Sequence, residues 1–472
     1  MPSSSLSKRR YEALPRRQQA VNSLLKSQIT AGALCLCFAS AHAAVSPEEA
    51  KRLGNELTGT GAQKAGNKEG TIPAYTGGLT AVPASFDKSS NLRPDPFAEE
   101  KPLFSIDAGN MDRHAERLSE GTKALLKAHP DFRLEVYPTH RTVAFPKAML
   151  DNTLANATRT KLTDDGLGAT GARGGVPFPI PANGNEVMLN HLLRYLGASL
   201  AMPEFSSYFA NRGGKVQPLV KASWLMDFPY HDDTRMPASP LYYRSRLAFT
   251  FPPNQVGNAI VHHEPADYSY DERRYWLYLP GQRRVRQAPE MAYDTPNGGT
   301  GGISTQDDVY LFNGKMDRFD WKLVGKKELY VPYNTYRFIY NTKPDEVFLP
   351  KFINPQVVRW ELHRVWVVEA TRKPGARHVY SRRTFYVDED SWHVLASDQY
   401  DGKGQLWRAG FAYLTQAYDA AAPVSITAGH YDLAEGAYYV NLWPGASGIR
   451  FPTTLEPDGN WTPESLAGQG IR

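Results

Sequence analysis

The sequence predicts a mainly β protein of antiparallel strands, with covering α-helices and an extended N-terminal arm. From residue 216 onward, short runs of β-branched and aromatic residues alternate with turns rich in Gly, Pro and Asp. Aromatic residues make up 12% of the chain, which suits an aromatic-lined sheet or a binding cavity, although packing uses aromatics in the same way. Residues 44–110, rich in Gly, Thr, Lys and Pro near their start, read as the arm.

Residues 1–43 have the layout of a secretory signal peptide. A basic segment from Lys8 to Lys26 precedes an apolar stretch over 29–41, and Ala41-His42-Ala43 is a small-residue cleavage pattern. An amphipathic first helix of the mature protein is the alternative. We expect export to the periplasm by ordinary secretion, because neither arginine pair of this segment abuts the apolar stretch.

Removing this leader changes the chemistry of the chain. Cys35 and Cys37 both lie in the apolar stretch, so the remaining 429 of the 472 residues hold no cysteine. Leu34 and Leu36 precede them where a lipid-anchoring cysteine needs a small residue, so neither an anchor nor a transmembrane segment is expected in the mature chain. Six of the 54 Lys and Arg and one of the 49 Asp and Glu leave with the leader. The 48 of each sign that remain give no reason to expect a nucleic-acid partner.

After the arm, residues 111–472 are expected to form one domain with two helices. The first, over about 112–128, has its leucines at helical spacing and begins with Asp112 as a possible cap. The second, over about 186–200, places four leucines and a valine on nearly one face. Such helices either cover the open side of a cavity or belong to an ordinary core.

The arm and the segments beside the helices have weaker patterns. One short helix is predicted from Pro47 to Leu57, and the spaced apolar residues after it favour a docked arm over free disorder. Residues 132–149 are read as two short strands, and residues 162–185 as a long loop.

The predicted strands fall into hairpins and meanders. Pro280-Gly281 separates two runs that read as a hairpin, and Asp-rich turns at 388–390 and 401–404 join three later runs. The predicted strands are 241–251, 274–279, 283–286, 309–312, 319–324, 328–333, 357–371, 377–387, 392–399 and 405–413.

The stretch 357–371 gives the clearest candidate for a ligand-facing wall. Its alternation places Trp360, Leu362, Arg364 and Trp366 on one face, and a one-residue shift would bury several charges and expose both tryptophans. Arg364 on this apolar face must meet an acid, reach water or hold an anionic ligand head. Four aromatic residues from other predicted strands complete the ligand-contact candidates: Tyr243, Phe249, Trp276 and Trp321.

No sequence motif predicts catalysis, a metal or a cofactor. The chain has no nucleophile elbow, phosphate loop, zinc-protease helix motif or dinucleotide fingerprint. In His262-His263-Glu264 the adjacent histidines of a strand point to opposite faces, and His231-Asp232-Asp233 reads as a solvated acidic loop.

Three long motifs resemble a known family. Tyr-Trp-Leu-Tyr-Leu-Pro at 275–280 followed by Arg-Arg-Val-Arg, the segment 307–314, and the run 317–328 resemble the domain-of-unknown-function 1329 family of secreted Gram-negative proteins. The resemblance covers nearly the whole mature chain. That family is similar in turn to periplasmic lipoprotein carriers, which implies a large half-open antiparallel β-barrel or curved sheet and suggests a lipid-like ligand. No catalytic residues are associated with the family.

These observations predict a periplasmic, non-enzymatic binding or carrier protein for a lipid or other hydrophobic molecule, serving an envelope transport system. One alternative is an accessory subunit that docks on an envelope exporter or an outer-membrane protein without a ligand of its own. Another is a hydrolase for a hydrophobic or carbohydrate substrate. An open aromatic cavity favours the carrier, convergent carboxylates favour the enzyme, and a filled interior favours the accessory subunit.

Overall fold

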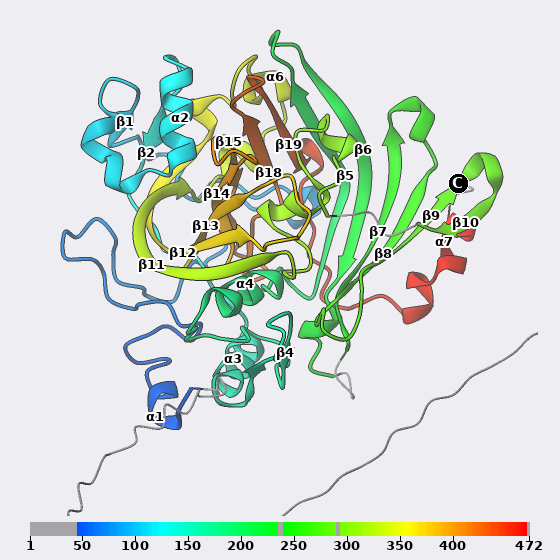
Figure 1. Ribbon diagram of the computed structural model, residues 1–472, viewed down its shortest axis with the longest axis horizontal. Coiled ribbons are helices and arrows are strands. Elements are labelled where there is room, and N and C mark those ends of the chain that lie inside the picture. The colour runs from blue at the N-terminus through cyan, green and yellow to red at the C-terminus, as the bar shows by residue number, and fades with distance from the viewer. Residues whose placement is uncertain (1–44, 235–238, 289–292, 470–472) are drawn as a thin grey trace, which may run out of the picture. The chain divides into compact units, whose positions relative to one another are not determined.

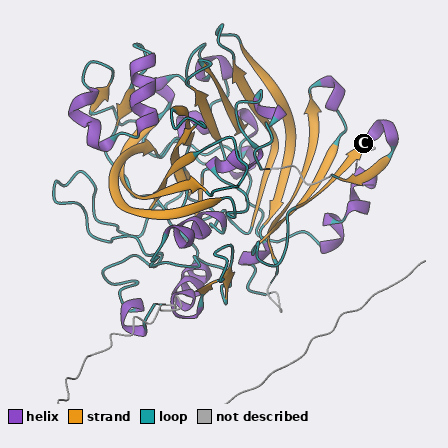
Figure 2. Ribbon diagram, viewed as in Figure 1, coloured by secondary structure: helices purple, strands orange, loops and turns teal. Residues whose placement is uncertain are grey.

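Fifteen strands form one large mixed sheet (Figures 1 and 2). The computed structural model describes residues 45–234, 239–288 and 293–469, so the predicted leader lies outside the described residues. In sheet order the strands are β1 (Phe104–Ile106), β2 (Leu134–Val136), β12 (Arg359–Arg372), β13 (Arg382–Asp388), β14 (Val394–Tyr400), β15 (Leu406–Ala412), β18 (Ala428–Asp432), β19 (Ala437–Trp443), β5 (Ser199–Ala210), β6 (Val216–Asp227), β7 (Leu241–Phe251), β8 (Ala259–Pro265), β9 (Arg274–Leu279) and β10 (Arg284–Gln287), with β11 (Phe319–Pro332) pairing with β12.

The pairing confirms the predicted mainly β, half-open class. Among the described residues the path of paired strands runs from β1 to β10 and does not close into a barrel. Neighbouring strands are antiparallel except β2, which runs parallel to the start of β12. Two short sheets lie outside this path, β3 (Lys161–Leu162) with β4 (Ala169–Thr170) and β16 (Thr415–Ala417) with β17 (Ala422–Val424).

The predicted hairpins and meanders are largely confirmed. Leu279 pairs with Arg284 in the β9–β10 hairpin, and β13, β14 and β15 follow one another as the predicted three-strand meander. Strand β7 has the predicted bounds. Turn residues and period-two alternation are local signals, so they locate strands without knowledge of the partner strand.

Two strand predictions were wrong in detail. The runs 319–324 and 328–333 join as the single long strand β11, because a bulge at Val324 and Gly325 absorbs the irregularity without breaking the ladder. The run 309–312 belongs mainly to a 3-10 segment, Gln306–Leu311, in which Tyr310 has a φ of 57°. The buried ion pairs of Asp307 and Asp308 with Arg383 hold this segment away from any ladder.

Seven α-helices lie among the described residues: α1 (Pro47–Ala50), α2 (Glu120–Ala128), α3 (Lys147–Arg159), α4 (Gly184–Leu192), α5 (Tyr336–Ile339), α6 (Pro344–Val347) and α7 (Pro463–Gln469). Three of them pack against the sheet: α2 contacts β14 and β15, α4 contacts β11 and β12, and α7 contacts β8, β9 and β10. In Figure 1, α7 lies beside the end of the sheet that β8, β9 and β10 form.

The predicted helices differ in their bounds. The expected 112–128 helix is a 3-10 segment, Met111–Arg117, followed by α2, whose cap is Ser119 and not Asp112. The second half of the expected 186–200 helix was wrong, because the chain turns after Leu192 and enters β5 at Ser199. Gly197, in the turn before β5, has a φ of 99°, a backbone conformation that glycine adopts without strain.

Two further helix predictions were corrected. The helix α3 begins at Lys147 within a stretch that was expected to be strand, of which only β2 forms. At the N-terminus, α1 stops at Ala50 instead of continuing to Leu57.

The arm packs against the sheet. Ile72 is buried in the larger hydrophobic core, and the Tyr75 hydroxyl donates a hydrogen bond to the carbonyl oxygen of Val143 at 2.8 Å. The Trp392 indole nitrogen donates to the carbonyl oxygen of Thr60 at 2.9 Å. The docked arm that the spaced apolar residues favoured is therefore observed from residue 45 onward.

The buried carboxylate of Asp398 on β14 binds the N-terminus of α2. It accepts hydrogen bonds from the backbone N–H groups of Glu120 and Gly121 and from the hydroxyl of Tyr386. Burial raises the pKa of Asp398 to about 6 from its ordinary value of 3.8. Between these two values the folded state binds more protons than the unfolded state, so the contribution of Asp398 to stability falls as the pH rises.

We therefore predict that Asp398→Asn removes a pH dependence. The free energy of unfolding of the wild type relative to the variant should decrease from about pH 4 to about pH 6 and then stay level. Urea unfolding across this range measures it, with the exposed Asp345→Asn as the matched control. A difference that rises with pH, or one that the control reproduces, would contradict the assignment.

Candidate functional site

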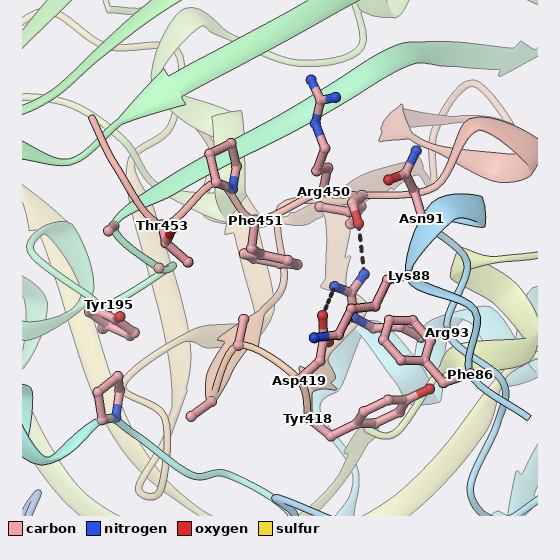
Figure 3. A pocket seen from close by; sticks show the side chains of 17 residues that line it. Phe86, Lys88, Asn91, Arg93, Tyr195, Tyr418, Asp419, Arg450, Phe451 and Thr453 are labelled. Carbon is pink, nitrogen blue, oxygen red and sulfur yellow. Dashed lines mark hydrogen bonds and ion pairs between the residues drawn. The ribbon is translucent and has the colours of Figure 1, made fainter. Parts of the chain in front are cut away.

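A cavity of about 620 Å³ lies beside the arm (Figure 3). Four segments far apart in the sequence form it, together with Pro146: the arm at 86–93, the turn at 195–198 after α4, the loop at 418–421 between β16 and β17, and the segment 449–453 after β19. Since the segments come from both ends of the chain, the cavity exists only when the arm is docked.

Aromatic rings supply much of the cavity wall. Phe86 packs edge-on against Tyr418 with ring centroids 5.4 Å apart, and Tyr195 and Phe451 line the opposite part. Burial raises the pKa of Tyr195 to about 12, so its hydroxyl stays neutral at physiological pH. The wall therefore offers flat apolar surfaces that suit a hydrophobic molecule.

Arg93 fixes the arm at this cavity. Its Nε and Nη2 donate to the two carboxylate oxygens of Asp419 at 2.7 and 2.9 Å, and its Nη1 donates to the carbonyl oxygen of Ile449 at 2.7 Å. The guanidinium also lies over the rings of Phe86 and Phe451. Burial alone lowers the pKa of Arg93, but Tyr340 and Asp419 outweigh it, so the pKa is raised and the group stays charged.

The edge of the cavity is electropositive. Lys88 and Arg450 also line it, both are exposed, and neither side chain forms an ion pair within the described part of the chain. Asp419 is the one acid on this wall, and Arg93 neutralises it. An anionic or strongly polar group would therefore be favoured beside the aromatic surfaces.

The residues predicted as ligand contacts lie elsewhere and do not converge on one surface. Trp360 and Leu362 are buried in the larger core, where Trp360 packs edge-on against Phe411. The other aromatic candidates divide among three packed clusters: Tyr243 and Phe249 with the larger core, Trp321 and Trp366 with the core beneath α4, and Trp276 with a small cluster on β8 and β9. None of the eight lines the cavity of Figure 3. Ligand contact by these residues stays a prediction.

Arg364 meets an acid, one of the three outcomes expected for a charge on this face. Its Nη1 donates to Glu389 at 3.0 Å, and its Nη2 donates to the carbonyl oxygen of Ala65 in the arm at 2.8 Å. The charge of Arg364 is thus used within the protein to hold the arm against β12.

Among the described residues, neither histidine-acid motif of the sequence brings three potential ligand atoms together. His262 contacts Glu264 at 2.8 Å, but Arg273 also donates to Glu264 from its Nε and Nη2. His263 points to the opposite face, where it contacts the carbonyl oxygen of Trp461. Burial raises the pKa of Glu264, but Arg273 and His262 outweigh it and lower it to about 2. Burial also lowers the pKa of His231 to about 4, and its ring packs edge-on against Tyr195.

Sequence reasoning used Phe86 only as evidence of docking and did not identify Arg93, Tyr418 or Phe451. Each lies in an irregular segment without periodicity, where neither strand nor helix patterns apply. Arg93 is one of two arginines in the arm, the other being Arg52, and no local pattern distinguishes it.

Comparison with known proteins gives a family and several similar structures. The model of the family "Protein of unknown function (DUF1329)" matches residues 105–467. An uncharacterized protein of Pseudomonas aeruginosa is 39% identical over 456 residues, which cover 93% of this chain and 97% of the relative.

Three solved structures are similar at low identity. A candidate outer membrane lipoprotein-sorting protein domain from Vibrio parahaemolyticus is 15% identical and covers 60% of this chain and 97% of its own, with a TM-score of 0.39. A DUF1329 family protein from Desulfovibrio piger is 16% identical, covers 57% and 92%, and has a TM-score of 0.36. A LolA superfamily protein from Nitrosomonas europaea is 11% identical, covers 60% and 98%, and has a TM-score of 0.33. All three TM-scores are below 0.5, so these structures carry no argument about the site of this chain.

We predict that Arg93→Ala lowers the free energy of unfolding by about 3 kcal/mol, because it leaves the Asp419 carboxylate without its buried partner. Urea unfolding measures the loss, and limited proteolysis should show faster cleavage within the arm. The matched control is Arg52→Ala, whose ion pair with Glu56 is exposed and should contribute less than about 1 kcal/mol. Equal effects of the two substitutions would show that Arg93 does not hold the arm.

Proposed function

We propose that this chain, which belongs to the DUF1329 family of proteins of unknown function, is a non-enzymatic binding protein of the periplasm for a hydrophobic molecule with an anionic or polar group. The ligand occupies the cavity between the docked arm and the segments 195–198, 418–421 and 449–453.

The composition of the cavity wall supports this proposal. A volume of about 620 Å³ lies within the range of roughly 300 to 1,000 Å³ typical of small-molecule sites. Phe86, Tyr418 and Phe451 present apolar surface, and Lys88 supplies a free charge at the edge. An amphipathic molecule matches both features, with its apolar part against the rings and its charged part toward the lysine.

The state of Asp419 favours binding over catalysis. Both of its carboxylate oxygens accept hydrogen bonds from Arg93, so the acid is held as a structural partner and is not poised as a general base. Tyr195, with its raised pKa, packs edge-on against His231, but His231 does not accept from its hydroxyl, since Nε2 contacts the carbonyl oxygen of Arg194 and Nδ1 has no partner. A carrier needs none of these groups to react.

The location follows from the predicted leader. Among the described residues no helix has the length and apolarity to cross a bilayer. Export to the periplasm would place the protein between the two membranes of a Gram-negative envelope, where hydrophobic molecules need a carrier to cross water.

We predict that Phe451→Ala and Lys88→Ala each weaken binding of a fluorescent fatty-acid analogue by roughly tenfold, about 1.4 kcal/mol. Phe451→Ala removes apolar contact area, and Lys88→Ala removes the charge at the edge. Fluorescence titration of the purified protein measures both. Tyr270→Ala and Lys127→Ala, both at exposed positions away from the cavity wall, are the matched controls and should bind as the wild type does.

Two results would contradict this site. Binding that survives Phe451→Ala but is lost in Trp366→Ala would favour the wall predicted from the sequence, since Trp366 is half-buried beside Trp392. Unchanged binding in all four cavity and control variants would show that the analogue binds elsewhere.

We also predict that the protein purified from the periplasm begins at or near Ala44. N-terminal sequencing measures the start, and fractionation of the cells measures the location. An intact leader on a cytoplasmic protein would remove the basis for a periplasmic role.

A further inference from the structure

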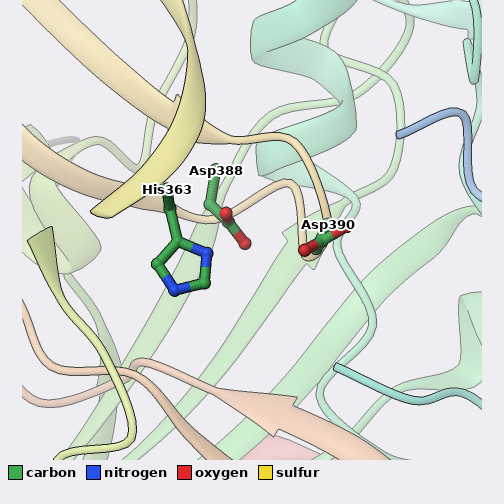
Figure 4. Close-up of side chains that lie close together, drawn as sticks. All are labelled: His363, Asp388 and Asp390. Atoms are coloured by element: carbon green, nitrogen blue, oxygen red, sulfur yellow. The ribbon is translucent and has the colours of Figure 1, made fainter. Parts of the chain in front are cut away.

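A second cluster of polar side chains, separate from the cavity residues, lies buried at the turn between β13 and β14. His363 on β12 and the two aspartates of this turn, Asp388 and Asp390, each place one potential ligand atom within 4.8 Å of the others (Figure 4). All three residues are buried. The sequence did not suggest this cluster because the histidine precedes the aspartates by a whole strand.

The charges around this cluster are balanced except at one carboxylate. Asp388 has no ion pair among the described residues, and it is 0% exposed. The neighbouring carboxylates are each paired with an arginine: Glu361 with Arg359 at 2.5 Å, Glu389 with Arg364 at 3.0 Å and Asp390 with Arg141 at 2.6 Å. A buried carboxylate without a cation is costly, so Asp388 is neutralised either by a proton or by a bound cation.

The Asp388 carboxylate is held with one oxygen free. Its Oδ2 accepts hydrogen bonds from the N–H and the hydroxyl of Ser391, at 2.9 and 2.6 Å, and a longer one from the Tyr333 hydroxyl at 3.4 Å. Its Oδ1 is buried and has no hydrogen-bond partner. The three donors therefore orient Asp388 so that Oδ1 faces the cluster with its lone pairs unused.

His363 presents a second unused lone pair. Its Nε2 lies 3.1 Å from Oε2 of Glu361, and its ring stacks on Tyr333 at 3.6 Å between centroids. An ionised carboxylate can only accept, so Nε2 carries the hydrogen and Nδ1 is left as an acceptor. Figure 4 shows Nδ1 on the side of the ring that faces Asp388. A histidine whose other nitrogen donates to a carboxylate is the arrangement that metal-ligating histidines adopt.

We propose that His363, Asp388 and Asp390 bind a divalent transition-metal ion such as Zn²⁺ or Mn²⁺. One imidazole nitrogen and two carboxylate oxygens form a donor set that suits these ions. Metal–ligand bonds of about 2.0 to 2.2 Å hold neighbouring ligands roughly 3 to 4 Å apart, so a separation of up to 4.8 Å closes by a small movement. Asp390 keeps a lone pair on each oxygen beyond its two bonds to Arg141.

The position of this site assigns it a structural role. It would join β12 to the β13–β14 turn, and the arm covers that turn, since Trp392 donates to Thr60 and Gln63 donates its N–H to Glu389. Bound metal would therefore stabilise the docked arm. This inference does not depend on the proposed ligand cavity, which shares none of these residues.

Metal content and thermal stability test the proposal. The full-length mature protein is stripped with a chelator, incubated with ZnCl₂ or MnCl₂, desalted and measured by elemental mass spectrometry. One metal ion per chain and a rise of several degrees in Tm, reversed by the chelator, are expected. No bound metal and no change in Tm with either ion would overturn the proposal and leave a shared proton between Asp388 and His363.

Asp388→Asn separates metal binding from folding. An asparagine amide can donate a hydrogen bond to Nδ1 of His363 while its oxygen accepts from Ser391, so the variant should fold without metal. We expect its Zn²⁺ binding to weaken at least about tenfold and its Tm to become insensitive to metal. His363→Gln, which keeps a donor toward Glu361, should lose binding in the same way.

The exposed Asp345→Asn serves as the matched control and should bind Zn²⁺ as the wild type does. Wild-type binding in both Asp388→Asn and His363→Gln would place the metal elsewhere and overturn the assignment. Loss of binding in the control as well would show that the metal bound only through surface carboxylates, which would also overturn it.

Discussion

The need to pair charges buried on β12 determines how the arm, the turns and the sheet fit together. This strand is paired by β11 along one edge and by β13 and β2 along the other, and most of its side chains on both faces are buried. Arg359, Glu361 and Arg364 are buried there and cannot be solvated by water. Glu361 pairs with Arg359 on the same strand, while Arg359 also reaches Glu100 of the arm and Arg364 reaches Glu389 of the β13–β14 turn and Ala65 of the arm, which holds those segments in place.

The same requirement shapes the cavity. Arg93 of the arm is a buried charge. Its bidentate pair with Asp419 holds the β16–β17 loop beside Phe86 and Phe451. The pair neutralises itself, which leaves the aromatic surfaces for a ligand and the exposed Lys88 for its polar group. The Arg93–Asp419 pair thus holds the cavity together, while Lys88 is left to contact a ligand.

The aromatic residues of the long strands are used mainly for packing. Trp360, Trp321 and Tyr243 pack against other rings in the cores, as large aromatic side chains do whenever a sheet is covered on both sides. The described cavity forms instead where irregular segments meet. This separation lets the sheet remain rigid while the binding surface is built from loops and the arm.

The sequence by itself determined the β class, the positions of β7, β9, β10 and β11 to β15, the family and the predicted leader, because alternation, turn residues and long motifs are local properties of the chain. It also showed that Arg364 needed a partner. Only the tertiary structure decided that the partner is Glu389, that the 186–200 helix ends at Leu192, and that Arg93 reaches Asp419. Contacts between residues distant in the sequence depend on how strands pair and cross, and no local pattern of one sequence encodes that geometry.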